Sequence, residues 1–223
     1  MLLVEKPNGW TSFDVVNKLR NELRKATGNK KIKVGHSGTL DPLATGLLII
    51  CTGSWTKKLN DLLGLDKEYS GIITLGGTTP TLDAESEIQE TFPTDHINEK
   101  LIEEKIKNFI GEIDQIPPLF SAIKIDGQPL YKKARKGEDV EIPARKIFIH
   151  SFEITAIQLP DLHFKVKCSK GTYIRSLARD FGKALGSGGF LKELQRDSIG
   201  DFKLLDAKDV NSLILQIRTY GKN

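Results

Sequence analysis

Residues 35–46, Gly35-His36-Ser37-Gly38-Thr39-Leu40-Asp41-Pro42-Leu43-Ala44-Thr45-Gly46, are the most informative stretch of this chain. They precede an apolar run, residues 47–51, that predicts a buried strand. Glycine lets a ligand approach the backbone closely, and Pro42 biases Asp41 away from helical conformation. Asp-Pro is also ordinary turn chemistry. Because loops on rigid scaffolds carry much of protein chemistry, Asp41 is a candidate functional group as well as a turn residue.

The composition is that of a globular protein. The 223 residues are 39% hydrophobic and 28% charged, and no apolar run approaches the roughly 18 residues that span a bilayer. The first residues lack the basic flank and the long apolar stretch of a secretory signal. We therefore expect a single domain over residues 1–223, a cytoplasmic location, no membrane association and a monomer.

The cysteines and histidines show no metal-binding pattern. Cys51 and Cys168 both lie in apolar or strand-like surroundings, which predicts two buried, inert thiols rather than a disulfide framework. The four histidines are scattered without ligand spacing, so no metal site is predicted.

Charge is segregated along the chain. Residues 18–33 carry seven basic side chains against one acid, and residues 165–183 carry six against one. Residues 83–104 carry eight acids against one lysine. The basic segments flank glycine-rich motifs, which favours contact with a polyanion such as RNA. The acidic segment is interpreted as a solvated face.

Hydrophobic periodicity predicts alternating helices and neighbouring strands, hence an α+β fold with an antiparallel-rich sheet. Four residues are expected to face inward from the second helix, namely Trp55, Leu59, Leu62 and Leu63. The core stripe of the next helix is expected to consist of Leu101, Ile102, Ile106, Phe109 and Ile110. The predicted strands cover 2–4, 47–51, 68–76, 120–125, 148–154, 162–168 and 190–199, with the strands over 148–154 and 162–168 joined at Pro160-Asp161. The first predicted helix begins at Thr11 or Ser12 and places Val15, Val16, Leu19 and Leu23 on one face. The other predicted helices cover 54–63, 98–110, a short basic stretch from Tyr131 to Gly137, 172–185 and 206–218.

Five segments, taken in order, resemble the motifs of the TruB family of tRNA pseudouridine synthases. The resemblance spans residues 2 to about 200. The segments are Lys6-Pro7-Asn8-Gly9-Trp10-Thr11-Ser12, the Asp41 stretch, Lys67-Glu68-Tyr69, residues 115–124 (Gln-Ile-Pro-Pro-Leu-Phe-Ser-Ala-Ile-Lys) and residues 169–177 (Ser-Lys-Gly-Thr-Tyr-Ile-Arg-Ser-Leu).

The resemblance implies the pseudouridine synthase fold, with a mixed, largely antiparallel sheet, and isomerisation of uridine 55 in the T-arm loop of tRNA. Asp41 would be the nucleophile. Arg175 would be its cationic partner, although the same residue could be a surface arginine on the helix that opens at Thr172. The isomerisation involves no redox step, so no cofactor is required.

Further site residues follow from the same motifs. Tyr69 and Tyr173 would stack on or beside an extruded base, although strand tyrosines often simply pack in a core. His36 would insert into the T loop, and Leu194 would line the uracil pocket. Lys6 and Lys124 would support the site or contact RNA, with core or surface roles left open.

The resemblance also implies an inserted RNA-gripping segment at about 124–146. Only residues 197–223 follow Arg196, so we expect no C-terminal PUA-type RNA-binding domain. The usual Leu-Arg-Arg of the family is Leu194-Gln195-Arg196 in this chain, which weakens the expectation of an RNA contact there.

Two other functions are compatible with the residues. An RNA-binding or tRNA-folding protein with little turnover would keep the pocket, but it would not need Asp41. A small hydrolase with a carboxylate pair is disfavoured, because the acids of residues 83–104 share no motif with Asp41.

Overall fold

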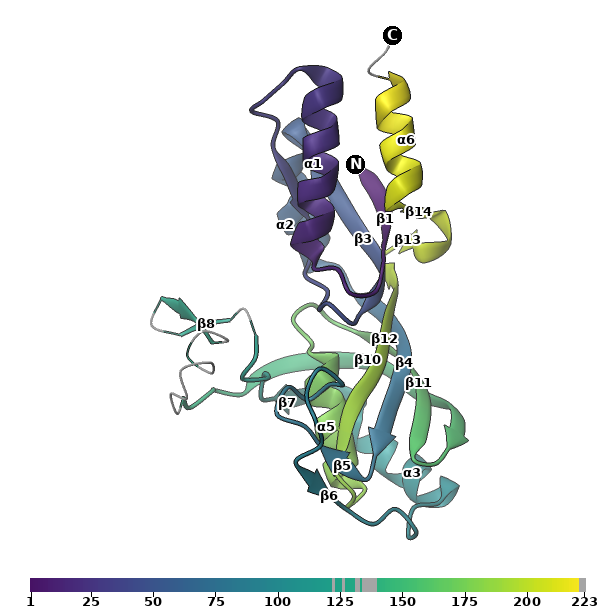
Figure 1. The fold of residues 1–223 in the computed structure, drawn as a ribbon. Coiled ribbons are helices and arrows are strands. Elements are labelled where there is room, and N and C mark those ends of the chain that lie inside the picture. The colour runs from purple at the N-terminus through teal and green to yellow at the C-terminus, as the bar shows by residue number, and fades with distance from the viewer. Residues whose placement is uncertain (122, 126, 131–132, 134–139, 221–223) are drawn as a thin grey trace. The chain divides into compact units, whose positions relative to one another are not determined.

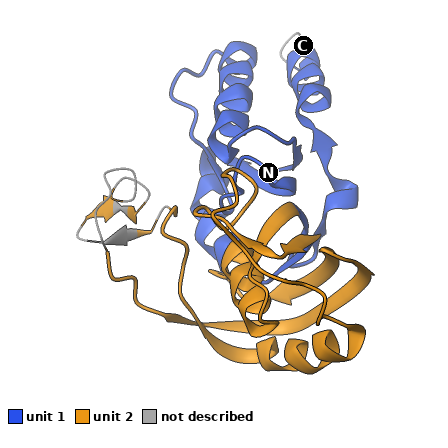
Figure 2. Ribbon diagram, turned by 60° about the horizontal axis from the view of Figure 1, so that its bottom comes forward, with its two compact units in different colours: residues 1–70, 194–223 blue, residues 71–193 orange. Residues whose placement is uncertain are grey.

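The computed structural model describes residues 1–121, 123–125, 127–130, 133 and 140–220, without the side chains of residues 124, 125 and 129. The chain forms two compact units, residues 1–70 with 194–223 and residues 71–193 (Figure 2). Two strands, β4 and β12, contribute residues to both units, because the unit boundaries fall after Ser70 and after Glu193.

The elements follow the chain in this order (Figure 1). In the first unit they are β1 (Leu2–Lys6), α1 (Ser12–Thr27), β2 (Val34–His36), β3 (Thr45–Thr52), the 3₁₀ helix η1 (Gly53–Lys58), α2 (Leu59–Gly64) and the start of β4 (Lys67–Leu75), then the end of β12 (Gly189–Ile199), β13 (Phe202–Lys203), η3 (Leu204–Asp206), β14 (Lys208–Asp209) and α6 (Val210–Tyr220). In the second they are the rest of β4, β5 (Gly77–Thr78), β6 (Glu90–Thr91), α3 (Glu99–Ile106), η2 (Lys107–Phe109), β7 (Gly111–Gln115), β8 (Lys124–Ile125), β9 (Gln128–Pro129), β10 (Arg145–Gln158), β11 (Asp161–Cys168), α5 (Ile174–Ala184) and the rest of β12.

The main sheet is mixed and largely antiparallel, which confirms the predicted α+β class. Its strand order is β14-β1-β3-β12-β4-β11-β10-β7, with β2 paired to β3 and β13 to β12. Among the described pairs, β1 with β14 and β3 with β12 are parallel, whereas β1–β3, β2–β3, β7–β10, β10–β11 and β12–β13 are antiparallel.

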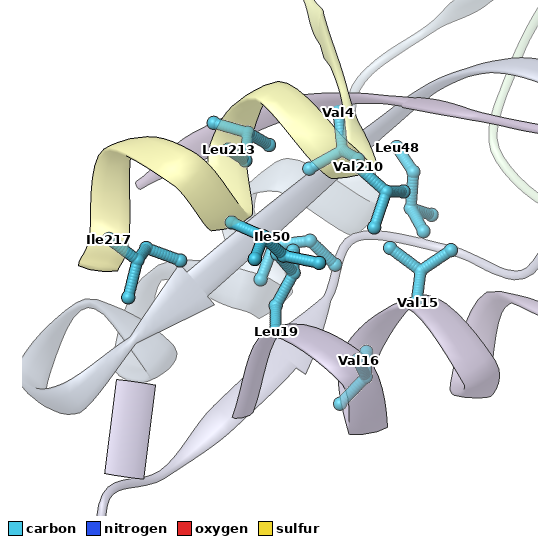
Figure 3. Close-up of a cluster of buried hydrophobic side chains, with 10 residues drawn as sticks. Val4, Val15, Val16, Leu19, Leu48, Ile50, Val210, Leu213 and Ile217 are labelled. Carbon is cyan, nitrogen blue, oxygen red and sulfur yellow. The ribbon is translucent and has the colours of Figure 1, made fainter. Parts of the chain in front are cut away.

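Strand β3 is the centre of the first unit, and it is apolar because both of its faces are covered. Leu48 and Ile50 face one cluster, while Leu47, Ile49 and Cys51 face the other. The first cluster joins α1, α6, β1 and β3 (Figure 3), and its buried members are Val4, Val15, Val16, Leu19, Leu48, Ile50, Val210, Leu213, Ile214 and Ile217.

Helix α1 begins where the sequence predicts. Thr11 is the N-cap, and a reciprocal capping box joins it to Asp14. Gly28 follows the helix in the left-handed region, with φ of 67°. The predicted apolar face is confirmed, because Val15, Val16 and Leu19 are buried.

The predicted helix over 54–63 is partly wrong. Its first half is the 3₁₀ helix η1, and only the second half, α2, is α-helical. A 3₁₀ turn advances each side chain by a larger angle than an α-helix does, which breaks the expected stripe. Trp55 is therefore 53% exposed and Leu63 40% exposed, whereas Leu62 is buried as predicted.

In the second unit the predicted long hairpin is confirmed, but several predicted element boundaries are wrong. Strands β10 and β11 pair antiparallel around Pro160-Asp161 as predicted. Strand β7 was not predicted, since its alternating polar residues give little apolar signal. Ile110 was expected in the core stripe but is 48% exposed, because α3 gives way to η2 before it.

Other boundaries differ by a few residues. Helix α5 starts at Ile174 and α6 at Val210, later than expected. Of the described residues within the strand predicted over 120–125, those of β8 are in a strand. Most of the basic helix predicted from Tyr131 to Gly137 lies outside the described residues. Cys51 and Cys168 are both buried, as predicted.

None of the helices that the structure describes is long and apolar enough to cross a membrane. Across the described residues, no three His, Cys, Asp or Glu side chains come together in a way that could hold a metal ion.

Candidate active site

The Asp41 loop is tied to the N-terminal segment of the first unit on both sides of its carboxylate. Before Asp41, the Leu40 N–H donates to Ser12 Oγ at 2.8 Å, and this hydroxyl donates to the Leu40 carbonyl at 3.1 Å. After Asp41, the Pro42 carbonyl accepts from the Gly9 N–H at 2.9 Å. Since both neighbours are held, the backbone of the half-buried Asp41 has little freedom to move.

Lys6 is the charged part of the same arrangement. Its side chain is fully buried, and Nζ donates to the carbonyls of Pro7 at 2.9 Å, Trp10 at 2.5 Å and Pro42 at 3.2 Å. Burial lowers the pKa of Lys6 to about 8, while the nearby charge of Asp41 acts in the opposite direction. Lys6 therefore remains a cation at neutral pH and favours the ionised form of Asp41.

Arg196 holds the two ends of the Asp41 loop, a role that sequence reasoning missed. It is 1% exposed, with Nε donating to the Leu47 carbonyl at 2.7 Å and Nη2 to the Gly38 carbonyl at 3.2 Å. Gly46, with φ of 101°, lies so close that a Cβ there would be 2.4 Å from the Arg196 carbonyl oxygen. The only sequence signal was the position of Arg196 after Leu194 in a family motif.

Three other predicted site residues also lie in the first unit. His36 ends β2, and burial lowers its pKa, which favours a neutral imidazole. Tyr69 is buried in β4, with 8% of its surface exposed. Leu194 lies in β12, and its carbonyl accepts from Thr45 Oγ1 at 3.4 Å.

Arg175 belongs to the second unit and is buried, so it is not a surface arginine on its helix. Nη1 lies 3.4 Å from Asp83 Oδ2, and both side chains are 7% exposed. Nη1 also donates to the Thr81 carbonyl at 2.9 Å, and Nη2 to the Phe120 carbonyl at 3.0 Å. These contacts fix the guanidinium plane.

Asp83 corrects the interpretation of residues 83–104 as a solvated face. It is 5% exposed, and its Oδ1 accepts from Thr81 Oγ1 at 2.5 Å and from the Glu85 N–H at 3.0 Å. The preceding residue, Leu82, has a φ of 62°, which L-residues rarely adopt. The sequence held one signal, because Asp83 is the only acid of the stretch with an apolar residue on both sides, Leu82 and Ala84.

Tyr173 directly precedes α5 and is half-buried. Its N–H donates to Gln115 Oε1 at 2.8 Å, and its carbonyl accepts from Gln115 Nε2 at 3.0 Å. The ring lies beside the Arg145 guanidinium, with Cζ 4.7 Å from the ring centroid. Lys124 is in β8, and its side chain is among those that the structure does not describe.

The structure therefore assembles the predicted residues in two groups. Asp41 and Lys6 lie together in the first unit, which also holds His36, Tyr69 and Leu194; Arg175, Tyr173 and Lys124 belong to the second. The expected pairing of Asp41 with Arg175 joins residues of different units and stays a prediction.

Sequence comparison matches residues 24–174 to the family described as TruB family pseudouridylate synthase (N terminal domain). The chain is 59% identical over 211 residues to tRNA pseudouridine synthase B of Flavobacterium johnsoniae, covering 94% of this chain and 92% of that protein. It is 52% identical to the protein of the same name from Phocaeicola vulgatus, covering 95% and 90%.

Two solved structures share the fold across 99% of this chain. A Cbf5-Nop10-Gar1 complex matches with a TM-score of 0.74 at 28% identity, over 58% of that chain. An H/ACA RNP bound to a substrate RNA containing 2'-deoxyuridine matches with a TM-score of 0.71 at 26% identity, over 54% of that chain.

Proposed function

Because this chain belongs to the TruB family of pseudouridine synthases, we propose that it isomerises uridine 55 in the T-arm loop of tRNA, with Asp41 as nucleophile. The observation that carries the proposal is the way the Asp41 loop is held. Ser12, Gly9 and Lys6 of one family motif bind the residues on either side of the carboxylate of another. A binding protein would have no need for a carboxylate positioned in this way.

The reaction exchanges one bond between ribose and base for another. The bond from C1′ to N1 breaks, the bond from C1′ to C5 forms, C5 loses a proton and N1 gains one. Nucleophilic catalysis divides such a change into easier steps, and it requires the ionised form of the carboxylate. Lys6 is the buried cation whose charge favours that form in the first unit.

Arg175 is proposed to be the second cationic partner of Asp41. Its guanidinium is oriented by Asp83 and by the Thr81 and Phe120 carbonyls, and it keeps a fixed charge in a buried position. A guanidinium can bind a carboxylate through two parallel hydrogen bonds, which would orient the nucleophile as well as keep it ionised.

The remaining site residues are proposed to hold the extruded nucleotide. An unstacked base needs a new stacking surface, which Tyr69 supplies, with Tyr173 beside it and Leu194 lining the pocket. His36 occupies the space in the T loop that the flipped nucleotide leaves. A neutral imidazole suits this role, because it can stack among bases without carrying a charge into the loop.

The RNA partner is proposed to be the T-arm stem-loop. The basic stretches 18–33 and 165–183 supply the charge that attracts a phosphate backbone. The segment over about 124–146, with Lys124, is proposed to grip the RNA, and much of it lies outside the described residues.

The test is to incubate the pure protein with unmodified tRNA transcript and to map pseudouridine. The wild-type protein should modify position 55, while Asp41→Asn should form no product yet still bind a T-arm stem-loop. Asp61→Asn is the matched control, since this acid is exposed in α2 and lies 3.7 Å from Lys58. Near-normal turnover by Asp41→Asn would refute the assignment of Asp41 as the nucleophile. RNA binding by the wild-type protein without any product would favour an RNA-folding role instead.

A further inference from the structure

One rung of the second unit's sheet contacts Tyr173 in two ways. Strands β7 and β10 pair antiparallel, and in their register Gln115 lies directly opposite Arg145. Both side chains contact Tyr173. Gln115 contacts the backbone of Tyr173, and Arg145 contacts its ring. Both contacts therefore come from one rung of the sheet.

Gln115 fixes the backbone of Tyr173. The side-chain amide exchanges two hydrogen bonds with the main chain, accepting from the Tyr173 N–H at 2.8 Å and donating to its carbonyl at 3.0 Å. Gln115 is 1% exposed, so water does not compete for these bonds. Because both backbone groups of Tyr173 are held, the direction of its Cα–Cβ bond is set before α5 begins.

Arg145 fixes the ring. Its Cζ lies 4.7 Å from the ring centroid, within the range of a cation–π contact. Its Nε and Nη2 atoms are buried and have no hydrogen-bond partner among the residues that the structure describes. The guanidinium therefore lies over one face of the ring.

We propose that Gln115 and Arg145 are positioning residues, a two-point clamp that sets the ring of Tyr173 for the reaction. The inference rests on the proposed function, in which Tyr173 lies beside the reacting base. With one ring face covered by Arg145, only the opposite face and the edge are left for the nucleotide. The clamp acts through Tyr173, so its loss affects the rate of the bound complex rather than the affinity for RNA.

A double-mutant cycle tests the clamp, measured as the single-turnover rate at saturating T-arm RNA. Arg145→Ala should lower this rate about tenfold or more, since small misplacements of site groups are costly. Arg145→Lys, which keeps the charge but not the planar stack, should recover only part of the loss. In a Tyr173→Leu background, Arg145→Ala should change the already reduced rate by less than about twofold, because the ring it positions is gone.

Several outcomes separate this inference from its competitors. Equal losses from Arg145→Ala in both backgrounds would overturn it. A loss confined to RNA affinity that grows steeply with salt would also overturn it, because Arg145 would then be a phosphate contact. Lys105→Ala is the control, because this lysine of α3 lies outside the segments proposed to bind RNA and its Nζ contacts the neighbouring Glu104 Oε1 at 2.9 Å. It should leave the rate unchanged.

Folding and function are checked separately. Thermal unfolding of each variant shows whether Arg145→Ala folds, and if it does not, Arg145→Gln and Gln115→Ala replace it in the same cycle with the same expectations. Absence of pseudouridine formation by the wild-type protein would refute the proposed function. If the wild-type protein forms pseudouridine and the effects of the Arg145 and Tyr173 substitutions on the rate are additive, only the clamp is refuted.

Discussion

Replacing Lys6 by methionine tests how the Asp41 loop is held. Methionine keeps the length and the apolar stem of the lysine but removes the ammonium group. Three carbonyls, those of Pro7, Trp10 and Pro42, then lose a donor in a site closed to water. We expect Lys6→Met to fold with clearly reduced stability and to retain part of its activity.

The size of the stability loss follows from these contacts. A buried carbonyl left without a donor costs about 1–3 kcal/mol, whereas removing a buried charge returns part of that cost. The lowered pKa of Lys6, about 8, shows that burial already disfavours the ammonium. A net loss of about 3 kcal/mol is expected, which lowers the melting temperature by roughly 6–12 °C in a chain of this size.

The effect on activity should be smaller than that of removing Asp41. The Pro42 carbonyl loses Lys6 but keeps its bond from the Gly9 N–H at 2.9 Å, and Ser12 still holds Leu40. The single-turnover rate should fall about tenfold rather than vanish. Lys18→Met, an exposed substitution on α1, is the control and should change stability by less than about 0.5 kcal/mol.

The pH dependence gives an independent check on Lys6. Its pKa is about 8 in the folded protein and 10.5 for the ordinary side chain, so the unfolded chain binds more protons between these values. Stability contributed by this site therefore rises with pH across that window. In urea unfolding from pH 7 to 10.5, the unfolding free energy of the wild type should increase relative to that of Lys6→Met. A difference in unfolding free energy that stays constant or shrinks with pH would contradict the role of Lys6. So would a Lys6→Met protein that is as stable as wild type at pH 7.

Three further perturbations test the first unit. Gly46→Ala places a Cβ 2.4 Å from the Arg196 carbonyl oxygen at a φ of 101°, so it should destabilise by about 3 kcal/mol or more in urea unfolding; a loss within about 1 kcal/mol would show that the loop gives way. The hydrogen bond from Arg218 at 2.8 Å lowers the pKa of Glu22 to about 2 from 4.5, so its stabilisation is present above pH 4.5 and lost as the pH falls toward 2. Glu22→Gln should therefore be less stable at pH 6 and match the wild type near pH 2, and parallel pH curves would contradict this. Leu19→Ala, at a fully buried position, should cost about 3–4 kcal/mol, which thermal unfolding measures.

The predictions that succeeded were mostly those that depend on neighbouring residues. The α1 cap, the buried run of β3 and the hairpin around Pro160-Asp161 are encoded within a few positions, and the structure has all three. Trp55 was misplaced because a 3₁₀ turn replaced the expected α-helix, and apolar spacing alone does not distinguish the two. Strand β7 was not predicted, because its own composition gives little strand signal and its strand conformation depends on pairing with β10.

The candidate site divides in the same way. Asp41, Tyr69, Tyr173 and Arg175 were predicted from motifs, because the proposed chemistry of each depends on residue type. Their supporting groups were not assigned such roles, since Arg196 and Gln115 act through backbone contacts with distant segments.

By itself, the sequence determined the local elements and the residues able to do chemistry, because caps, turns and apolar runs act over a few residues. Only tertiary structure decided which of those residues support one another. Ser12 and Leu40 are 28 positions apart, and Arg175 reaches a carbonyl 94 positions away at Thr81. Asp83 looks like one solvated acid among many until that folding brings a buried guanidinium beside it, because the burial of a charge depends on a partner that local sequence does not contain.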